Sequence, residues 1–265
     1  MEIRFGPSGL GGKQEAIAVL EKYHEFGLKA CEVAFTYGVY LDKKSAEEIG
    51  KKAKELDIYL SIHAPYYINL NSEDKTKIVA SKKRILDCCE IGHYLSNGKH
   101  KTPIVFHSGF YSKMKPDEAF ENIKKEIIEL MAEIEKKKFN VVLCPEVMGK
   151  RNVFGSVEEI SRLVKETGCS FCIDFAHVLA RYDKSNFELI EENFGKVKEW
   201  HCHFSGIDYG DKGEKNHKHT EEKEWKNLFG FLKNQKKEIT IVSEAPNPVG
   251  DAKEGLELWT KVSSP

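Results

Sequence analysis

Ser170-Phe171-Cys172-Ile173-Asp174-Phe175-Ala176-His177 is the stretch from which the fold of this chain is best inferred. Gly168 precedes a short apolar run that ends in a carboxylate, a pattern typical of a buried strand with Asp174 at its carboxyl end. His177 follows three positions later, in a loop or a first helical turn, from which its side chain can turn back toward Asp174. Taken alone, an Asp here is more often a helix N-cap, so this pair by itself is weak evidence for a metal site.

The same pattern recurs along the chain. Five further short apolar runs end in a histidine or a carboxylate, and these are Ile62-His63, Phe106-His107, Pro145-Glu146, Cys202-His203 and Ser243-Glu244. One strand that ends in a polar residue has many explanations, whereas a series of them indicates a common cause. Parallel strands provide that cause, because their carboxyl ends open on the same side of a sheet.

Strand and helix patterns alternate without a linker or low-complexity segment. The predicted strands span 2–6, 28–35, 58–63, 103–107, 141–146, 170–174, 197–203 and 239–244. The predicted helices span 13–26, 45–56, 72–95, 187–194, 222–233 and 252–262, with one more that begins at Pro116 and another that Ser156 caps. Eight such units in 265 residues favour the α/β class and a closed (β/α)8 TIM barrel, a single domain over residues 1–265; an open doubly wound sheet is the alternative.

The composition restricts the classes of function. The chain has 41 Lys plus Arg against 42 Asp plus Glu, so any nucleic-acid binding must be local to one face. Its apolar stretches are far shorter than the roughly 20 residues of a membrane helix, and residues 1–5 lead into a strand pattern without a secretory signal. Seven cysteines, an odd number, indicate buried free thiols in a reducing compartment. We therefore expect a cytoplasmic protein that contacts no membrane.

Three histidines and three carboxylates would meet at the mouth of the barrel. They are His63, His107, Glu146, Asp174, His203 and Glu244. Carboxylates held so close together cannot all ionise without a cation between them. Imidazole and carboxylate ligands without a thiolate suit Zn²⁺, Mn²⁺ or Fe²⁺ better than Mg²⁺ or Ca²⁺. With His177 and His217 there are more candidate ligands than one four-coordinate ion can use, so we expect two or three ions, with Glu146 as the bridge.

Two neighbouring histidines leave the ligand set open. His201 points toward the mouth if His203 does, because residues two apart on a strand share a face. His219 is a lesser rival of His217. Whichever histidines serve, paired ions a few ångström apart typically activate a water and stabilise both oxygens of an in-line displacement at phosphorus.

The segments that carry these ligands resemble the motifs of a known family. They are His63-Ala-Pro-Tyr-Tyr-Ile-Asn-Leu70, Phe106-His-Ser-Gly109, Pro145-Glu146, Cys172-Ile-Asp-Phe-Ala-His177, His203-Phe-Ser205 and Ser243-Glu-Ala-Pro246. Over nearly its whole length the chain is similar to the endonuclease IV family of apurinic/apyrimidinic endonucleases, within the xylose-isomerase-like barrel superfamily. The resemblance implies three zinc ions.

The resemblance also implies a role for each residue. His63 and His107 would hold one ion, which Glu146 bridges to a second. Asp174, His203 and Glu244 would complete the second site, and His177 and His217 would hold the third ion. Tyr66 matches a family aromatic that enters DNA at the lesion, and we expect Tyr67 to contact DNA beside it.

Two segments depart from the family pattern. The family's third ion also takes an Asp two residues before its last His, and Lys215 stands there in this chain. Glu214 can replace that Asp if the loop is shifted; otherwise the third site is weaker or absent. The family's polar and basic insertion after the second strand is here Tyr37-Gly38-Val39-Tyr40, which argues against penetration of DNA by that loop.

The leading hypothesis is a metal-dependent phosphodiesterase of base excision repair that cuts double-stranded DNA 5′ to an abasic site. A metal-bound hydroxide would attack phosphorus, Glu146 and Glu244 would be the catalytic carboxylates, and the enzyme would act as a monomer. A sugar isomerase or epimerase of the same superfamily, with one ion, is the first alternative. A barrel that binds damaged DNA without cutting it is the second.

Overall fold

The computed structural model of the chain describes residues 2–96, 98 and 100–263. Its strands are β1 (Glu2–Pro7), β2 (Ala30–Ala34), β3 (Tyr59–His63), β4 (Thr102–Phe106), β5 (Val141–Pro145), β6 (Cys172–Asp174), β7 (Glu199–Phe204), β8 (Gly206–Gly210), β9 (Gly213–Lys218) and β10 (Glu238–Ser243). Its helices are α1 (Ala16–Glu25), α2 (Lys43–Glu55), α3 (Lys75–Leu95), α4 (Pro116–Lys137), α5 (Val157–Thr167), α6 (Phe175–Tyr182), α7 (Phe187–Phe194), α8 (Glu222–Leu232) and α9 (Pro248–Ser263).

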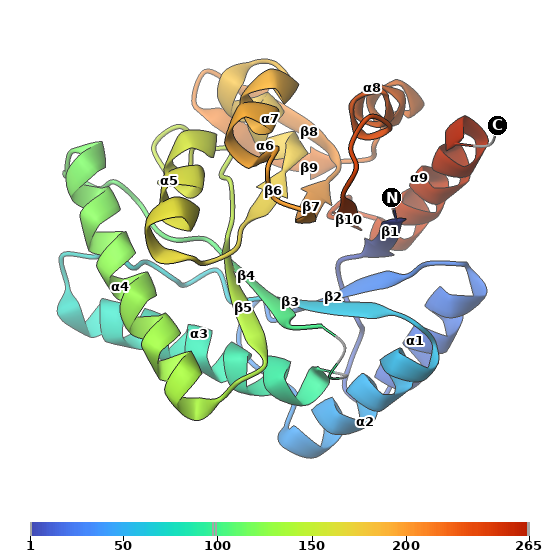
Figure 1. Cartoon of the computed structure of the whole chain (residues 1–265), viewed down its shortest axis with the longest axis horizontal. Helices are drawn as coiled ribbons and strands as arrows, with labels where there is room; N and C mark the ends of the chain where they lie inside the picture. The colour runs from blue at the N-terminus through green and yellow to red at the C-terminus, as the bar shows by residue number, and fades with distance from the viewer. Residues whose placement is uncertain (1, 97, 99, 264–265) are drawn as a thin grey trace.

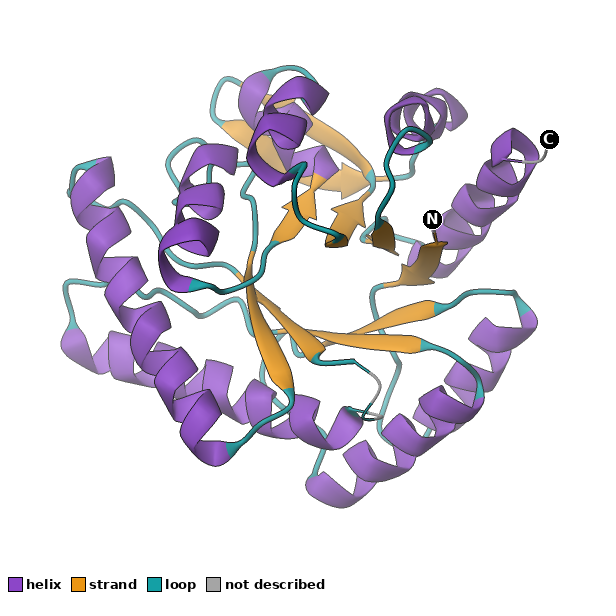
Figure 2. Cartoon of the chain, viewed as in Figure 1, coloured by secondary structure: helices purple, strands orange, loops and turns teal. Residues whose placement is uncertain are grey.

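Two parallel four-stranded sheets curve around a common interior. One has the order β1-β10-β7-β6 and the other β2-β3-β4-β5. Single parallel bridges join them at both seams, Ser8 to Glu32 and Glu146 to Cys172. The helices form a ring outside the strands (Figures 1 and 2). The predicted (β/α)8 TIM barrel is therefore confirmed, since every barrel strand has a parallel neighbour on each side.

Two elements add to the predicted alternation. The chain forms helix α6 directly after Asp174, whose Oδ1 caps it by accepting a hydrogen bond from the backbone N–H of His177 at 2.8 Å. After β7 the chain forms the antiparallel hairpin β8–β9, where the sequence pattern showed only a loop. Both additions lie at the carboxyl end of the barrel, and both carry candidate site residues.

The main core lies between the strands and the helices. Trp225 of α8, fully buried, packs against Phe5 of β1 and Phe204 of β7, with ring centroids 6.1 and 4.8 Å away. Gly255 of α9 faces the same indole, and a Cβ at that position would come within 2.7 Å of it. Aromatic packing of this kind fixes the helices against the strands and so fixes the strand ends that carry the site.

The interior of the barrel holds both apolar and polar side chains. Val105, Cys144 and Cys172 pack together. Glu32, Ser61 and His201 are almost fully buried as well. All seven cysteines are buried and free, as predicted. None of the helices in the described part of the chain combines the length and apolar character that a membrane span requires.

Candidate metal centre

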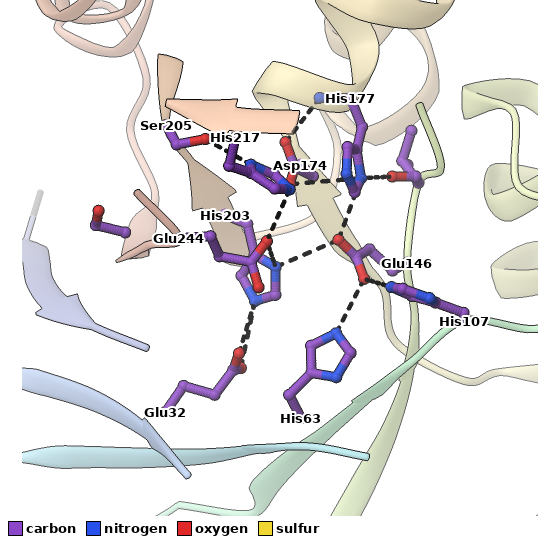
Figure 3. Close-up of polar contacts among 12 residues, drawn as sticks. Glu32, His63, His107, Glu146, Asp174, His177, His203, Ser205, His217 and Glu244 are labelled. Carbon is purple, nitrogen blue, oxygen red and sulfur yellow. Dashed lines mark hydrogen bonds and ion pairs between the residues drawn. The ribbon is translucent and has the colours of Figure 1, made fainter. Parts of the chain in front are cut away.

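The polar residues at the strand ends converge on one space at the mouth of the barrel. His63 ends β3, Asp174 ends β6 and His203 is the penultimate residue of β7. His107, Glu146 and Glu244 each follow the final residue of their strand. Figure 3 shows these side chains pointing toward one another from strands on both sides of the barrel.

Glu146 is at the centre of this space. Its Oε2 lies 3.3 Å from Nε2 of His63 and 3.0 Å from Nε2 of His107. Its Oε1 lies 3.3 Å from Nδ1 of both His177 and His203. The carboxylate is fully buried, so a bridging role between cations is compatible with its position.

Among the described residues, three groups of ligand-capable atoms share members at the mouth, and in each group all the atoms lie within 4.8 Å of one another. The groups are His63, His107 and Glu146; Glu146, Asp174, His203 and Glu244; and Asp174, His177 and His217. Glu146 belongs to the first two groups and Asp174 to the last two. These three groups contain every ligand that the sequence predicted except Glu214, which lies beside the third group, 3.3 Å from His177.

Backbone and hydroxyl oxygens orient three of the imidazoles. Nδ1 of His63 lies 2.8 Å from the carbonyl of Ala64, and Nδ1 of His177 lies 3.0 Å from that of Val147. Nδ1 of His217 lies 2.6 Å from Oγ of Ser205. A carbonyl can only accept, so for His63 and His177 the proton is on Nδ1, which leaves Nε2 as the nitrogen that can bind a metal.

The structure places the rival histidines in different surroundings. His217 lies in the third group, whereas His219 is largely exposed and faces Asp251 and Glu254 at 3.3 and 3.7 Å. His203 lies in the central group. His201 lies one layer deeper in the barrel, where its Nε2 is 3.2 Å from Glu32.

A bulge in the β8–β9 hairpin brings Glu214 to the site. Asp208 pairs with Asn216 and Tyr209 pairs with Glu214, so Lys215 has no residue opposite it. One extra residue shifts the alternation of side chains, and Glu214 and His217 therefore face the centre together. Oε2 of Glu214 lies 3.3 Å from Nε2 of His177, while Lys215 is exposed. Glu214 could replace the family Asp only if the loop was shifted, and the bulge provides that shift.

Three buried atoms around the third group lack a hydrogen-bond partner among the described residues: Oδ2 of Asp174, Nε2 of His177 and Oε2 of Glu214. A buried polar atom without a partner is costly, and two of these three are acceptors on carboxylates. A cation would satisfy all three, so the donor set here fits a metal ion.

The negative charges of the buried carboxylates in the centre must be neutralised, either by protons on the imidazoles or by bound cations. Burial alone would raise the pKa of Glu146, but His107 and the other imidazoles lower it well below its ordinary value. Burial would lower the pKa of His63, yet the hydrogen bond and charge of Glu146 raise it to about 9. Burial raises the pKa of Asp174. Without metal, protonated imidazoles therefore neutralise the carboxylates, and bound cations would displace those protons.

Comparison with known proteins places the chain in a family. Residues 20–262 match the family model described as xylose isomerase-like TIM barrel. The chain belongs to that family. It is 33% identical over 259 residues to an uncharacterized protein of Methanocaldococcus jannaschii, with 91% of each chain covered. It is 26% identical over 213 residues to a probable endonuclease 4 of Aquifex aeolicus, which covers 74% of this chain and 71% of that protein.

Solved structures agree with this family fold. The crystal structure of SacUVDE superposes with a TM-score of 0.74 at 16% identity and covers 98% of this chain and 99% of its own. D-psicose 3-epimerase from Clostridium cellulolyticum H10, solved with D-tagatose, gives 0.68 at 14% identity with 99% of both chains covered. At these identities the likeness concerns the fold alone.

Within this family fold, two exposed tyrosines lie in the loop after β3, beside the mouth of the barrel. Tyr66, 60% exposed, places its ring centroid 5.9 Å from that of His107 and 6.3 Å from that of His63. Tyr67 is equally exposed in the same loop, and its carbonyl accepts a hydrogen bond from Arg84 at 3.3 Å. Tyr66 therefore lies over the first group, whereas Tyr67 lies on the rim.

Sequence reasoning missed Glu32. This carboxylate interrupts the otherwise apolar strand β2, is fully buried, and contacts His203 from below the centre (Figure 3). A charged residue in the middle of an apolar run was the available signal, because charges are almost never fully buried unless paired. Its partner on another strand was visible only after folding.

Proposed function

We propose that this protein is a metal-dependent phosphodiesterase that cuts DNA 5′ to abasic sites, and that it leaves a 3′-hydroxyl and a 5′-deoxyribose phosphate. The observation that carries the proposal is the row of three ligand groups joined by Glu146 and Asp174. Adjacent divalent ions suit in-line displacement at phosphorus, where both the attacking and the leaving oxygen need a positive charge beside them.

The residues present fit Zn²⁺, with Mn²⁺ or Fe²⁺ as alternatives, because all ligands of the three groups are imidazoles and carboxylates. His63, His107 and Glu146 would hold the first ion, and Glu146 with Asp174, His203 and Glu244 the second. Asp174, His177 and His217 would hold the third ion, with Glu214 beside them. When bound, such ions acidify water and neutralise phosphate oxygens.

Glu146 and Glu244 are the carboxylates that we assign to catalysis. Both approach Nδ1 of His203, at 3.3 and 3.5 Å, but they differ in access. Glu146 is fully buried, whereas the side chain of Glu244 is 19% exposed. Burial would raise the pKa of Glu244, yet His203 lowers it to about 2. Glu244 is therefore ionised at neutral pH, and its partial exposure lets it orient a water at the mouth by accepting a hydrogen bond.

Tyr66 supports DNA as the substrate. Its exposed ring beside His63 and His107 suits stacking on a base or insertion next to a lesion. Lys150, Lys212 and Lys215 are exposed in the loops around the third group and suit contacts to phosphate. The similarity to a probable endonuclease 4 supports the same substrate class.

The test is incision of a duplex that contains one abasic site, at low salt with Zn²⁺ or Mn²⁺. We expect one cut, with a 3′-hydroxyl that a polymerase can extend. His217→Gln should abolish or strongly reduce incision, whereas His219→Gln should not, because His219 faces α9 instead of the centre. Intact duplex after incubation with metal-loaded protein would refute the proposal.

A sugar epimerase is the second candidate, and one observation favours it. Glu146, Asp174, His203 and Glu244 alone form a complete four-ligand site for one ion. Such a site can polarise a hydroxy-ketone while a glutamate moves the proton. Metal content separates the candidates: about one ion per chain, together with epimerisation of a ketohexose, would favour the epimerase, and two or three ions would favour phosphodiester cleavage.

A further inference from the structure

Glu32 is a buried charge in a fixed place. Its backbone joins β2 to the segment that directly follows β1, since its carbonyl accepts a hydrogen bond from the N–H of Gly9 at 2.8 Å. Its side chain points into the barrel and is inaccessible to solvent. Burial of an isolated carboxylate costs several kcal/mol, so the surrounding residues must supply compensating contacts.

Side chains from two other strands supply those contacts. Oγ of Ser61 donates a hydrogen bond to Oε2 at 2.9 Å, and Nε2 of His201 lies 3.2 Å from the same oxygen. Nε2 of His203 forms its hydrogen bond with the same Oε2 at 3.3 Å and lies 3.1 Å from Oε1, which has no hydrogen-bond partner among the described residues. A buried carboxylate that accepts a hydroxyl hydrogen bond and faces two imidazole nitrogens is stabilised in its ionised form by these contacts. An ionised carboxylate can only accept, and the proton of each contact therefore lies on nitrogen or on the hydroxyl.

His203 is oriented differently from the other histidines of the centre. His63 and His177 use Nδ1 for their carbonyl partner and direct Nε2 inward. His203 uses Nε2 for Glu32 and directs Nδ1 toward Glu146 and Glu244. Without Glu32, the proton of a neutral His203 ring would be attracted to Nδ1 by those two carboxylates, and the ring would then have no free nitrogen for a cation.

We propose that Glu32 is a positioning residue of the metal centre, which holds the proton of His203 on Nε2 and keeps Nδ1 available as a ligand. Ser61 and His201 hold Glu32 itself in place. A carboxylate behind a ligating imidazole also makes the imidazole a more basic ligand. The inference rests on the proposed function only in requiring that the central group binds metal; it does not require DNA as the substrate.

The experiment compares Glu32→Leu and Glu32→Gln with the wild type. Thr240→Val is the matched control, because Thr240 is buried in the strand next to β7 and pairs with His201. Zn²⁺ binding to the metal-free proteins is measured by calorimetry, with circular dichroism to verify folding. We expect Glu32→Leu to weaken binding about 10- to 100-fold, in the range found for removal of partners behind metal ligands. Glu32→Gln, which keeps an acceptor, should cause a smaller loss, and Thr240→Val none.

A second readout does not depend on metal. In ¹⁵N-labelled protein, the Nε2 proton of His203 should exchange slowly and resonate downfield, because it donates to a buried carboxylate. The signal is assigned by its loss in His203→Gln. It should move upfield in Glu32→Gln and vanish in Glu32→Leu. If Glu32→Leu does not fold, the shift in Glu32→Gln carries the test.

Three outcomes would overturn the inference. One is wild-type zinc affinity in both folded Glu32 variants, and another is a wild-type His203 ring that carries no proton on Nε2. The third is an ion held by Cys172, His201 and His203, whose atoms also lie within 4.8 Å of one another. Cobalt-loaded protein would then show a thiolate charge-transfer band that Cys172→Ser removes. Metal binding that depends on Glu32 without incision of abasic DNA would refute the proposed function and support this inference.

Discussion

Oε2 of Glu214 lies 3.3 Å from Nε2 of His177, although the two residues come from a hairpin and a helix that follow different barrel strands. The contact depends on the bulge at Lys215 and on a close approach of two backbones. A Cβ on Gly213 would come within 2.1 Å of the carbonyl oxygen of Gly149, so only glycine fits there. The third cation group therefore depends on how the hairpin docks on the loop after β5.

Glu214→Gln should weaken the binding of the third ion by roughly tenfold or more. The substitution removes the negative charge beside His177 but keeps the shape of the side chain. Metal content after dialysis should fall by up to one ion per chain. Lys215→Ala is the matched control and should leave the content unchanged, since Lys215 is exposed at the bulge. Equal metal content in Glu214→Gln and the wild type would contradict a role for this carboxylate.

Gly149→Ala should disturb the same group from the other side. Its Cβ would lie 2.8 Å from Cβ of Glu214 and 3.0 Å from Cδ2 of His177. We expect weaker binding of the third ion with the other sites retained, measured by calorimetric titration. Gly230→Ala in α8 serves as the control: its Cβ meets no atom within 4 Å, and alanine should stabilise the helix by about 1 kcal/mol. A third site of wild-type affinity in Gly149→Ala would exclude this packing.

Metal should stabilise the protein more as the pH rises. The pKa of His63 is about 9 in the folded, metal-free protein against an ordinary value of 6.5. Stability from its protonated form is fully present below pH 6.5 and is lost as the pH rises through 9. The Tm of metal-free protein should thus fall over this range. The increase in Tm on adding Mn²⁺ should grow, because fewer protons compete for Nε2. An increase that is constant or shrinks with pH would disprove this competition.

Arg181→Ala should lower the free energy of unfolding by roughly 2–4 kcal/mol, because the substitution removes several hydrogen bonds from a charged guanidinium at once. Nη1 of Arg181 donates to the carbonyls of Met148, Lys150 and Val153, and Nη2 donates to Oη of Tyr111. These contacts hold the loop against which the hairpin docks. Urea unfolding of metal-free protein gives the change in the free energy of unfolding.

Arg151→Ala is the control in the same loop. Arg151 pairs with Asp183 at the surface, where ion pairs contribute below about 1 kcal/mol. If both substitutions lower the free energy of unfolding by similar amounts, the hydrogen bonds of Arg181 to the carbonyls do not stabilise the loop more than a surface ion pair does.

Tyr66→Ala should reduce incision of abasic DNA mainly through weaker substrate binding, with a higher KM and metal content unchanged. Its ring lies beside His63 and His107, and base stacking on an aromatic is worth about 1–3 kcal/mol. Tyr67→Ala, in the same loop but on the rim, should have a smaller effect. A larger loss at Tyr67 would reverse the assignment of the two tyrosines.

Local patterns in the sequence determined the barrel and most of the candidate ligands. Apolar runs that end in a polar residue predict strand ends, and strand ends of a parallel barrel share one face, so His63 and Glu244 could be assigned to one site although they are far apart in the chain. The capping box of Ser156 and Glu159 was also predictable, because both partners lie within one helical turn.

Only the tertiary structure decided the remaining questions. His217 was separated from His219, and His203 from His201, by contacts with residues of other strands and helices. The bulge that turns Glu214 inward depends on the register of a hairpin that shows no strand pattern of its own. Glu32 could be noticed as a charge within an apolar strand, but its contact with His203 joins residues from non-adjacent barrel strands. Sequence periodicity reports the face on which a side chain lies, whereas the partner it meets there is set by how distant segments pack.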